Sequence, residues 1–171
     1  NVFIIQGLNK QLDDIILESL TNKSRSRNKT GNGPRSVSDP SYLLDEMRLI
    51  KSKEEINKMQ ISCNLASKAH IKAITSSKPG IGEWEIQSII EGHFISNLSE
   101  ISYSSIVGGG SNATVLHYKN NNCVINDGEL VLVDAGCEID GYASDITRTW
   151  PINGKFTKEQ IEIYEIVLEA E

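Results

Sequence analysis

Apolar and polar positions follow one another along the chain with spacings that predict three amphipathic helices after residue 51. Ser52 begins a Ser-x-x-Glu capping box, and apolar residues then recur at helical spacing until the Lys-Pro-Gly break at 78–80. A second helix is expected to begin at Glu83. A third should follow Thr157, which opens a Thr-x-x-Gln box. The apolar face expected to point inward on this last helix consists of Ile161, Tyr164 and Leu168.

The first forty residues follow a different pattern. Residues 2–5 are apolar and predict a short buried strand, and residues 9–20 have the spacing of an amphipathic helix. Residues 21–40 are rich in Asn, Lys, Ser, Arg and Gly, which favours a solvated loop or linker. A nucleic-acid-binding patch is the alternative, but no aromatic residues are interleaved with the basic ones.

Alternating residues at 101–107 predict a strand that runs into the glycine-rich segment 108–110. This segment has neither phosphate-binding pattern, GxxxxGK[ST] or GxGxxG, so a tight backbone passage beside a site is the better interpretation. Residues 114–118 predict a second strand, with His117 near its end.

The apolar run at 130–133 and the polar strand that Pro151 ends predict an antiparallel hairpin around Ile139-Asp140-Gly141. A two-residue turn centred on Ile139-Asp140 would place Asp134 directly opposite Asp145. A bulge at Gly141 would shift the pairing by about one position, and the sequence leaves both registers open. In either register two carboxylates lie on neighbouring strands.

Paired carboxylates repel each other, so a cation is expected near Asp134 and Asp145, most simply a divalent metal. From spacing alone, a turn residue and a surface strand residue are the commoner explanation. Asp140 fits a solvated turn position, and Cys137 fits a small buried strand residue. His70 and His93 fall beside apolar helix positions, where a packed histidine is more usual than a metal ligand.

Composition narrows the range of functions. A net charge of -6 and a pI near 5.1 argue against a nucleic-acid-binding surface. No apolar run approaches the roughly 18 residues of a membrane span, and no secretory signal is present. The three cysteines form no CxxC pair, which disfavours a disulfide framework and a thiolate zinc site and suggests a reducing compartment. The chain begins without Met and is expected to be a processed or excised piece.

Several motifs resemble those of aminopeptidase P, one of the pita-bread metallopeptidases. The resemblance covers about residues 43–171. The motifs that carry it are Glu46-Met-Arg-Leu-Ile-Lys51, Tyr103-Ser-Ser-Ile-Val-Gly-Gly-Gly110, Leu116-His-Tyr118, Asp134-Ala-Gly136, Gly141-Tyr142 and Ser144-Asp-Ile-Thr-Arg-Thr-Trp-Pro151. The resemblance implies an α+β fold, in which residues 41–171 form the first half of a pita-bread domain with an antiparallel sheet and packed helices. Residues 1–40 would be the tail of an N-terminal domain plus a linker.

The family resemblance also implies a reaction. Members hydrolyse peptides with two divalent ions, often manganese, held by two Asp, one His and two Glu. Only Asp134 and Asp145 match these ligands, with Asp145 at the position that bridges both metals. His117 matches a histidine that lines the substrate pocket and could steady charge on a tetrahedral intermediate. The remaining ligands would belong to a downstream half, so the chain alone is expected to be inactive.

The resemblance favours an aminopeptidase that releases the residue before a proline. A prolidase-type dipeptidase and a metal-free pita-bread module that binds peptides or proteins are the alternatives. Expected partners are peptide substrates, with no nucleic acid and no membrane span, and a homodimer stays open. Similarity to the mitochondrial intermediate-cleaving branch suggests a mitochondrial location, with the cytoplasm as the alternative.

Overall fold

The computed structural model describes residues 1–30 and 36–171, and for residues 22–30 it describes the backbone alone. The chain forms two compact units, Asn1–Ser52 and Lys53–Glu171. The division falls after Ser52, whereas the family resemblance implies a boundary near residue 40. Assignment of residues 1–40 to the tail of another domain stays a prediction.

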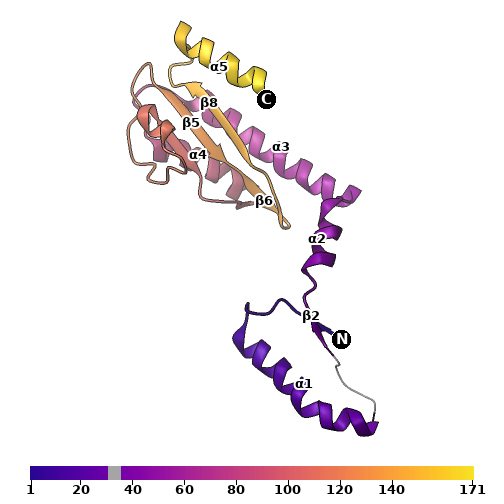
Figure 1. Ribbon diagram of the computed structural model, residues 1–171. Helices are drawn as coiled ribbons and strands as arrows, with labels where there is room; N and C mark the ends of the chain where they lie inside the picture. Colours follow the sequence, from indigo (N-terminus) through magenta and orange to yellow (C-terminus); the bar gives the residue numbers. More distant parts are fainter. Residues whose placement is uncertain (31–35) are drawn as a thin grey trace. The chain divides into compact units, whose positions relative to one another are not determined.

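In its described residues, the first unit contains two short strands and two helices (Figure 1). Its elements are β1 (Val2–Phe3), α1 (Lys10–Thr30), β2 (Val37–Ser38) and α2 (Ser41–Leu49). β1 pairs in parallel with β2. The expected strand is therefore present but is not buried, since Phe3 is 55% exposed. Asn9 caps α1, because its Oδ1 accepts a hydrogen bond of 3.0 Å from the backbone N–H of Leu12.

Helix α1 continues well beyond the predicted helix, so the expectation of a solvated loop from residue 21 is wrong up to Thr30. Lys, Arg and Ser are common in loops, but Lys and Arg are also good helix formers. No glycine or proline interrupts the segment from residue 21 to position 30. Residues 31–35 of the expected loop lie outside the described residues.

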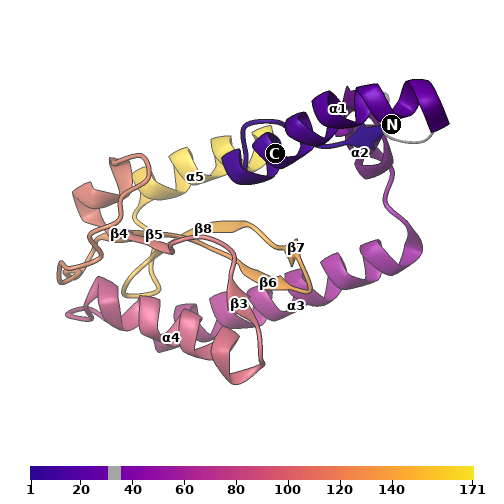
Figure 2. The ribbon, with the colours of Figure 1, turned by 90° about the horizontal axis from the view of Figure 1, so that it is seen from below.

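The second unit combines helices with two three-stranded antiparallel sheets, which confirms the expected α+β class. Its elements in chain order are α3 (Lys53–Ser76), α4 (Glu83–Ser96), β3 (Glu100–Ile101), β4 (Ile106–Gly109), the 3-10 helix η1 (Gly110–Thr114), β5 (Leu130–Ala135), β6 (Cys137–Ile139), β7 (Tyr142–Ala143), β8 (Ile146–Pro151) and α5 (Lys158–Ala170). The sheets have the strand orders β4-β5-β8 and β3-β6-β7. Figure 2 shows α3 and α4 on one side of these strands and α5 on the other.

The core lies between the two helices and the inner face of the sheets. Helix α3 contributes Ala66, Ala69 and Ala73, all fully buried, and such small side chains let a helix lie close to a sheet. Helix α4 contributes larger apolar residues, of which Ile86, Ile90 and Phe94 are fully buried. Two other apolar residues of α4 face solvent: Trp84 is 47% exposed and Ile95 is 67% exposed.

Two of the predicted strands are wrong. The expected strand at 101–107 is split into β3 and β4, because residues 102–105 leave the sheet between them. The expected strand at 114–118 is absent, and η1 with a following turn takes its place.

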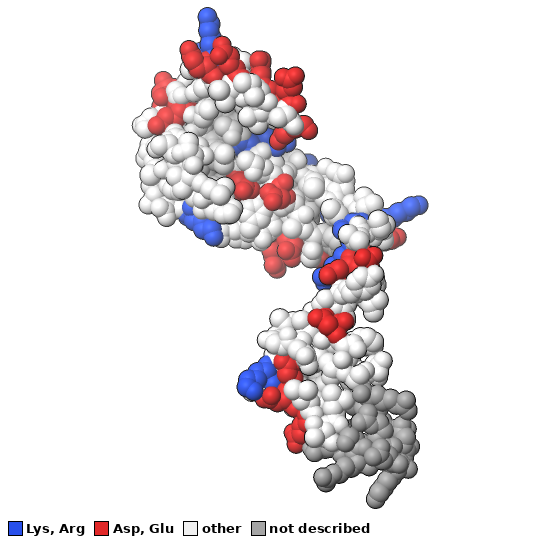
Figure 3. Space-filling model, viewed as in Figure 1, with Lys and Arg blue, Asp and Glu red and all other residues white. Residues whose placement is uncertain are grey.

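Helix α5 begins as predicted, because the Thr157 hydroxyl accepts a hydrogen bond from Gln160 N and the Gln160 side chain accepts one from Thr157 N. Its glutamates are exposed to solvent, and acidic side chains gather over this helix in Figure 3. The expected inward face is wrong: within the described chain Ile161 is 40% exposed and Leu168 is 59% exposed. Among the described helices, none combines the length and the apolar character required to cross a membrane.

Candidate metal centre

Strand β5 is the element that carries the candidate site. Val131, Val133 and Ala135 are fully buried against the helices, whereas the residues between them are half-buried on the other face. Asp134 belongs to this second face. Because side chains alternate along a strand, the same apolar run that fixes the core also places the Asp134 carboxylate outside it.

The hairpin that follows has a two-residue turn at Asp140-Gly141, where φ is 52° and 83°. Both values are positive, as a type I′ turn requires. Ile139 is part of the strand and pairs with Tyr142. The predicted turn centred on Ile139-Asp140 is therefore wrong, because a β-branched residue is poorly suited to positive φ whereas Asp and Gly tolerate it.

The observed register places Asp134 opposite Thr147 and not opposite Asp145. Neither of the two registers expected from the sequence is correct. The shift from the direct pairing is two residues, and side chains two residues apart along a strand point to the same side. Asp145 therefore stays on the side of Asp134 and is its diagonal neighbour.

Tyr103 joins the two carboxylates. Its hydroxyl lies 2.5 Å from Asp134 Oδ1 and 2.8 Å from Asp145 Oδ1. One hydroxyl has a single proton to share between two acceptors. The three side chains come from different places in the chain, namely the segment between β3 and β4, strand β5, and the residue before β8.

The electrostatics of this group leave negative charge uncompensated. Burial raises the pKa of the Tyr103 hydroxyl, and its hydrogen bonds to Asp134 and Asp145 raise that pKa further, so the group stays a proton donor. In the described parts of the chain, neither carboxylate forms a salt bridge. Oxygen-only donors with surplus negative charge fit a hard divalent cation such as Mn²⁺ or Mg²⁺.

Gly136 permits the close approach of the two carboxylate-bearing segments. A Cβ atom at this position would lie 1.8 Å from the backbone oxygen of Ser144, the residue before Asp145. The Ser102 hydroxyl donates a hydrogen bond of 3.0 Å to the same oxygen. Only glycine fits here without displacing the backbone.

His117 lies in a turn after η1 and not at the end of a strand. Its φ of 55° is left-handed, and its side chain is exposed. The turn is closed by hydrogen bonds from Val115 N to Asn112 O and from Tyr118 N to Val115 O. Within the described chain, His117 makes no hydrogen bond to either aspartate. Its assignment to the substrate pocket stays a prediction.

The remaining candidates behave as structural residues. His70 is 3% exposed, and its Nε2 lies 3.1 Å from the backbone oxygen of Ala135, to which it donates. Burial lowers its pKa, as expected for a packed histidine. Cys137 is fully buried, as predicted. Asp140 is exposed and forms a salt bridge of 3.0 Å with Lys58, which fits a solvated turn residue.

Sequence reasoning missed Tyr103 as a site residue. The alternation at 101–107 indicates one continuous strand, in which Tyr103 would be an ordinary strand position. The chain instead leaves the sheet at 102–105, and this bend brings the ring to the carboxylates. No local signal in the sequence marks the bend.

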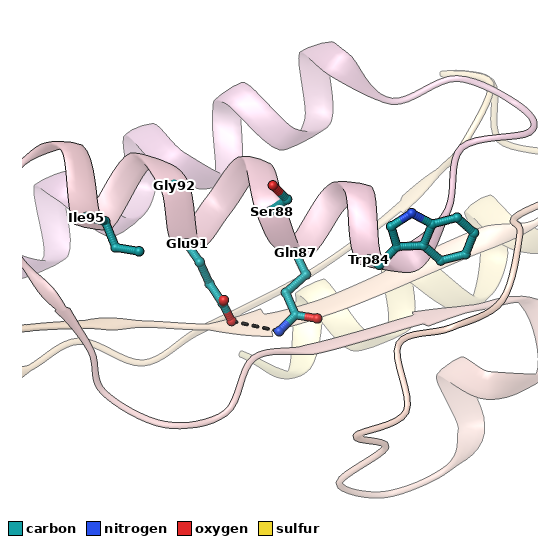
Figure 4. Close-up of a pocket in the computed structure, with 6 residues that line it drawn as sticks. All are labelled: Trp84, Gln87, Ser88, Glu91, Gly92 and Ile95. Atoms are coloured by element: carbon teal, nitrogen blue, oxygen red, sulfur yellow. Dashed lines mark hydrogen bonds between the residues drawn. The ribbon is translucent and has the colours of Figure 1, made fainter.

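The carboxylate pair has no third metal ligand within the part of the chain that the structure describes. Among those residues, no group of three or more His, Cys, Asp or Glu side chains is arranged to hold an ion. A surface hollow of about 300 Å³ lies elsewhere, along the outer side of α4 (Figure 4). It is lined by residues of this one helix, including Glu91, which accepts a hydrogen bond of 2.9 Å from Gln87. It does not include the carboxylate pair.

The chain is similar in sequence to known peptidases. Residues 57–171 match the profile of metallopeptidase family M24. The chain is 52% identical over 130 residues to Xaa-Pro aminopeptidase of Haemophilus influenzae, a match that covers 75% of this chain and 30% of that protein. It is 41% identical over 131 residues to the mitochondrial intermediate cleaving peptidase 55 of Arabidopsis thaliana, covering 76% of this chain and 27% of that protein.

Among solved structures, the chain matches a glutamate-to-alanine variant of Escherichia coli aminopeptidase P in complex with substrate. The TM-score is 0.88 at 42% identity, and the match covers 98% of this chain and 38% of that one. The expected pita-bread fold is thereby confirmed for the matched part. The chain spans about a third of the length of the relatives that it matches.

Proposed function

The chain belongs to metallopeptidase family M24, and we propose that the protein containing it is a metal-dependent aminopeptidase that removes an N-terminal residue from Xaa-Pro peptides. The observation that carries this proposal is the convergence of Asp134 and Asp145 on one hydroxyl, with no basic partner for either in the described chain. The relatives named Xaa-Pro aminopeptidase supply the substrate class.

Two divalent ions, manganese in this proposal, would be held in part by Asp134 and Asp145. Bound there, the ions would activate a water molecule and polarise the scissile carbonyl. A divalent ion of this kind takes about six ligands, which is more than two aspartates supply. Because the described residues offer no third ligand, we propose that the remaining ligands lie outside residues 1–171 and that this chain alone is inactive.

Tyr103 has a supporting role in the proposed site. Its hydroxyl holds one oxygen of each aspartate in place and donates toward the negative charge between them. A tyrosine hydroxyl is protonated at neutral pH, so the group is a hydrogen-bond donor. Hydrogen bonds of this kind orient metal-binding carboxylates and contribute to metal affinity.

His117 is the second functional side chain of the proposal. Its side chain is exposed and belongs to a turn closed by backbone hydrogen bonds, so it is accessible to a peptide. It would donate a hydrogen bond to the oxygen that gains charge in the tetrahedral intermediate. The role stays a proposal, supported by the match of Leu116-His-Tyr118 to the family motif.

The test uses the full-length natural protein that contains residues 1–171, loaded with manganese. Cleavage of a peptide beginning Xaa-Pro is measured for the unchanged protein and for Asp134→Asn and Asp145→Asn. Asp140→Asn is the matched control, since it removes a carboxylate from the same hairpin at a turn position that asparagine tolerates. Loss of activity in Asp134→Asn and Asp145→Asn, with activity kept in Asp140→Asn, supports the proposal.

Other outcomes select the alternatives. Cleavage of Xaa-Pro dipeptides but not of longer peptides would indicate a prolidase-type enzyme. Peptide binding without cleavage, unchanged in both aspartate variants, would indicate a metal-free binding module and contradict the proposal.

A mitochondrial location is part of the proposal. It is supported by the similarity to a mitochondrial relative from Arabidopsis thaliana, although the relative from Haemophilus influenzae is bacterial. Imaging of the tagged full-length protein in its own cells tests it, and a purely cytoplasmic signal would contradict it.

A further inference from the structure

Glu83, the first residue of α4, is a fully buried carboxylate that the proposed mechanism does not use. Burial of a carboxylate is unfavourable unless hydrogen bonds replace its water. Here two donors reach each oxygen. Oε1 accepts from Gly109 N at 2.8 Å and from Asn112 Nδ2 at 2.9 Å. Oε2 accepts from the Tyr118 hydroxyl at 2.9 Å and from Cys123 N at 3.0 Å.

The four donors come from one continuous stretch of chain. They belong to the end of β4, to η1, to the residue after His117, and to the approach to β5. A single side chain of α4 therefore holds residues 109–123 at four points. The N-terminal end of a helix favours a negative charge, which suits the position of Glu83.

A second residue of α4 reinforces this attachment. Gln87, which points away from the helix in Figure 4, accepts a hydrogen bond of 2.9 Å from Asn121 Nδ2. Asn121 is buried, and its Oδ1 accepts a hydrogen bond of 3.0 Å from Val107 N in β4. The loop is thus fixed to α4 and to β4 on both sides of His117.

His117 itself has little else to fix it. Its predecessor Leu116 is 86% exposed, and its own side chain is exposed. Its successor Tyr118 is 8% exposed and is held at its hydroxyl by Glu83 and by Asn112, the latter at 3.1 Å. The left-handed backbone of His117 is therefore set by the anchored Tyr118 that follows it and by Asn112 before it.

We propose that Glu83 is the positioning residue for His117 and acts through the hydroxyl of Tyr118. The proposal rests on the proposed function, in which His117 meets the substrate. A carboxylate is required because all four neighbours are donors. Glutamine has nearly the same shape, but in either orientation its NH₂ group would face a backbone N–H, that of Gly109 or that of Cys123, and leave this donor unpaired in a buried place.

The experiment compares Glu83→Gln and Tyr118→Phe in the full-length, manganese-loaded protein. Tyr142→Phe is the matched control, because it also removes a tyrosine hydroxyl that binds a glutamate, Glu55, but at the tip of the hairpin. We expect kcat to fall about 10- to 100-fold in both test variants, with the metal content unchanged. KM should change less than about threefold, and the control should keep full activity.

Combination with His117→Ala separates positioning from general stability. If Glu83 acts through His117, adding Glu83→Gln or Tyr118→Phe to His117→Ala should lower kcat by less than about twofold more. If the losses multiply in the double variants, the role is structural and the proposal is wrong. Should Glu83→Gln fail to fold, Tyr118→Phe carries the test, since it keeps the buried ring.

A measurement that does not depend on catalysis distinguishes failure of the positioning proposal from failure of the proposed function. The ring signals of His117 are followed by NMR, together with amide exchange at residues 115–118. Both should change in Glu83→Gln and Tyr118→Phe and stay constant in Tyr142→Phe. If they change while the unchanged protein cleaves no Xaa-Pro peptide, the proposed function fails and the positioning of His117 stands. If they do not change, the positioning proposal fails even in an active enzyme.

Discussion

The two faces of strand β5 consist of alternate residues of one short segment, yet they have different roles. The inner face consists of Val131, Val133 and Ala135, all fully buried against α3 and α4. The outer face consists of Leu130, Leu132 and Asp134, all half-buried, and it carries the candidate metal site. Stability and chemistry are therefore separated by the pleat of a single strand.

This arrangement makes the register of the hairpin decisive. A slip of one residue would turn every side chain to the other face and bury a carboxylate. A shift of two residues, as observed, preserves the faces and changes only which residues lie directly opposite. Substitutions that affect one face or both should separate the two functions.

Gly136→Ala should have the largest effect, because it disturbs both faces. The added Cβ would meet the Ser144 backbone oxygen at 1.8 Å, so the strand and the Asp145 segment must separate. We expect a loss of about 3 kcal/mol or more in the free energy of unfolding. Denaturant unfolding measures it. Gly92→Ala in α4, where the added methyl meets no atom within 4 Å, is the control and should be neutral or stabilising.

Truncation on each face sharpens the comparison. Val133→Ala removes methyl groups from the closed core and should lower the free energy of unfolding by about 2 kcal/mol. Leu132→Ala on the half-buried face should cost less than about 1 kcal/mol, although it removes more atoms. Thermal or denaturant unfolding of both variants without metal gives the two values. Equal costs would show that the outer face is as closely packed as the inner one.

Tyr103→Phe should act on the outer face alone. Loss of the hydroxyl removes the donor shared by Asp134 and Asp145, and the metal-binding carboxylates lose their orientation. We expect metal affinity to fall about tenfold. Calorimetry with manganese measures this in the full-length protein, beside Tyr142→Phe. A similar fall in both variants would indicate a general effect of losing a tyrosine hydroxyl.

The smallest expected effect is the pH dependence of the free energy of unfolding. It should depend on His70, which is hydrogen-bonded to Ala135 on the inner face. Burial lowers the pKa of His70 below its ordinary value, so the unfolded chain binds this proton more readily than the folded chain. Stability from His70 is therefore present above about pH 6.5 and is lost as pH falls through the lowered pKa. Unfolding between pH 7 and 5 without metal should show a shallower slope for His70→Gln. An unchanged slope would mean that His70 is not the titrating group.

Much of this framework could be predicted from the sequence. The caps at Ser52 and Thr157 and the break at 78–80 are local signals, and the helices begin and end where they indicate. The Asp-Gly dipeptide indicates the hairpin for the same reason, because its φ preferences are properties of those two residues. The motifs around Asp134 and Asp145 indicate the family.

What could not be predicted depends on distant contacts. The bend that brings Tyr103 to the aspartates is held by Ser102, which donates a hydrogen bond to the Ser144 oxygen across the fold. A turn forms at His117 in place of the predicted strand. Glu83 accepts hydrogen bonds from Asn112 before this turn and from Tyr118 after His117. Neither partner is near in sequence, so hydrophobic periodicity carries no signal for them.

Manganese binding to the full-length protein tests the central claim most directly, namely that the outer face of β5 is part of a two-metal site. Calorimetry would compare the unchanged protein with Asp134→Asn, Asp145→Asn and, as control, Asp140→Asn. We predict two bound ions in the unchanged protein and the control, and at least about 100-fold weaker binding in the other two variants. Equal manganese binding in all four proteins, or none in any, would contradict the account.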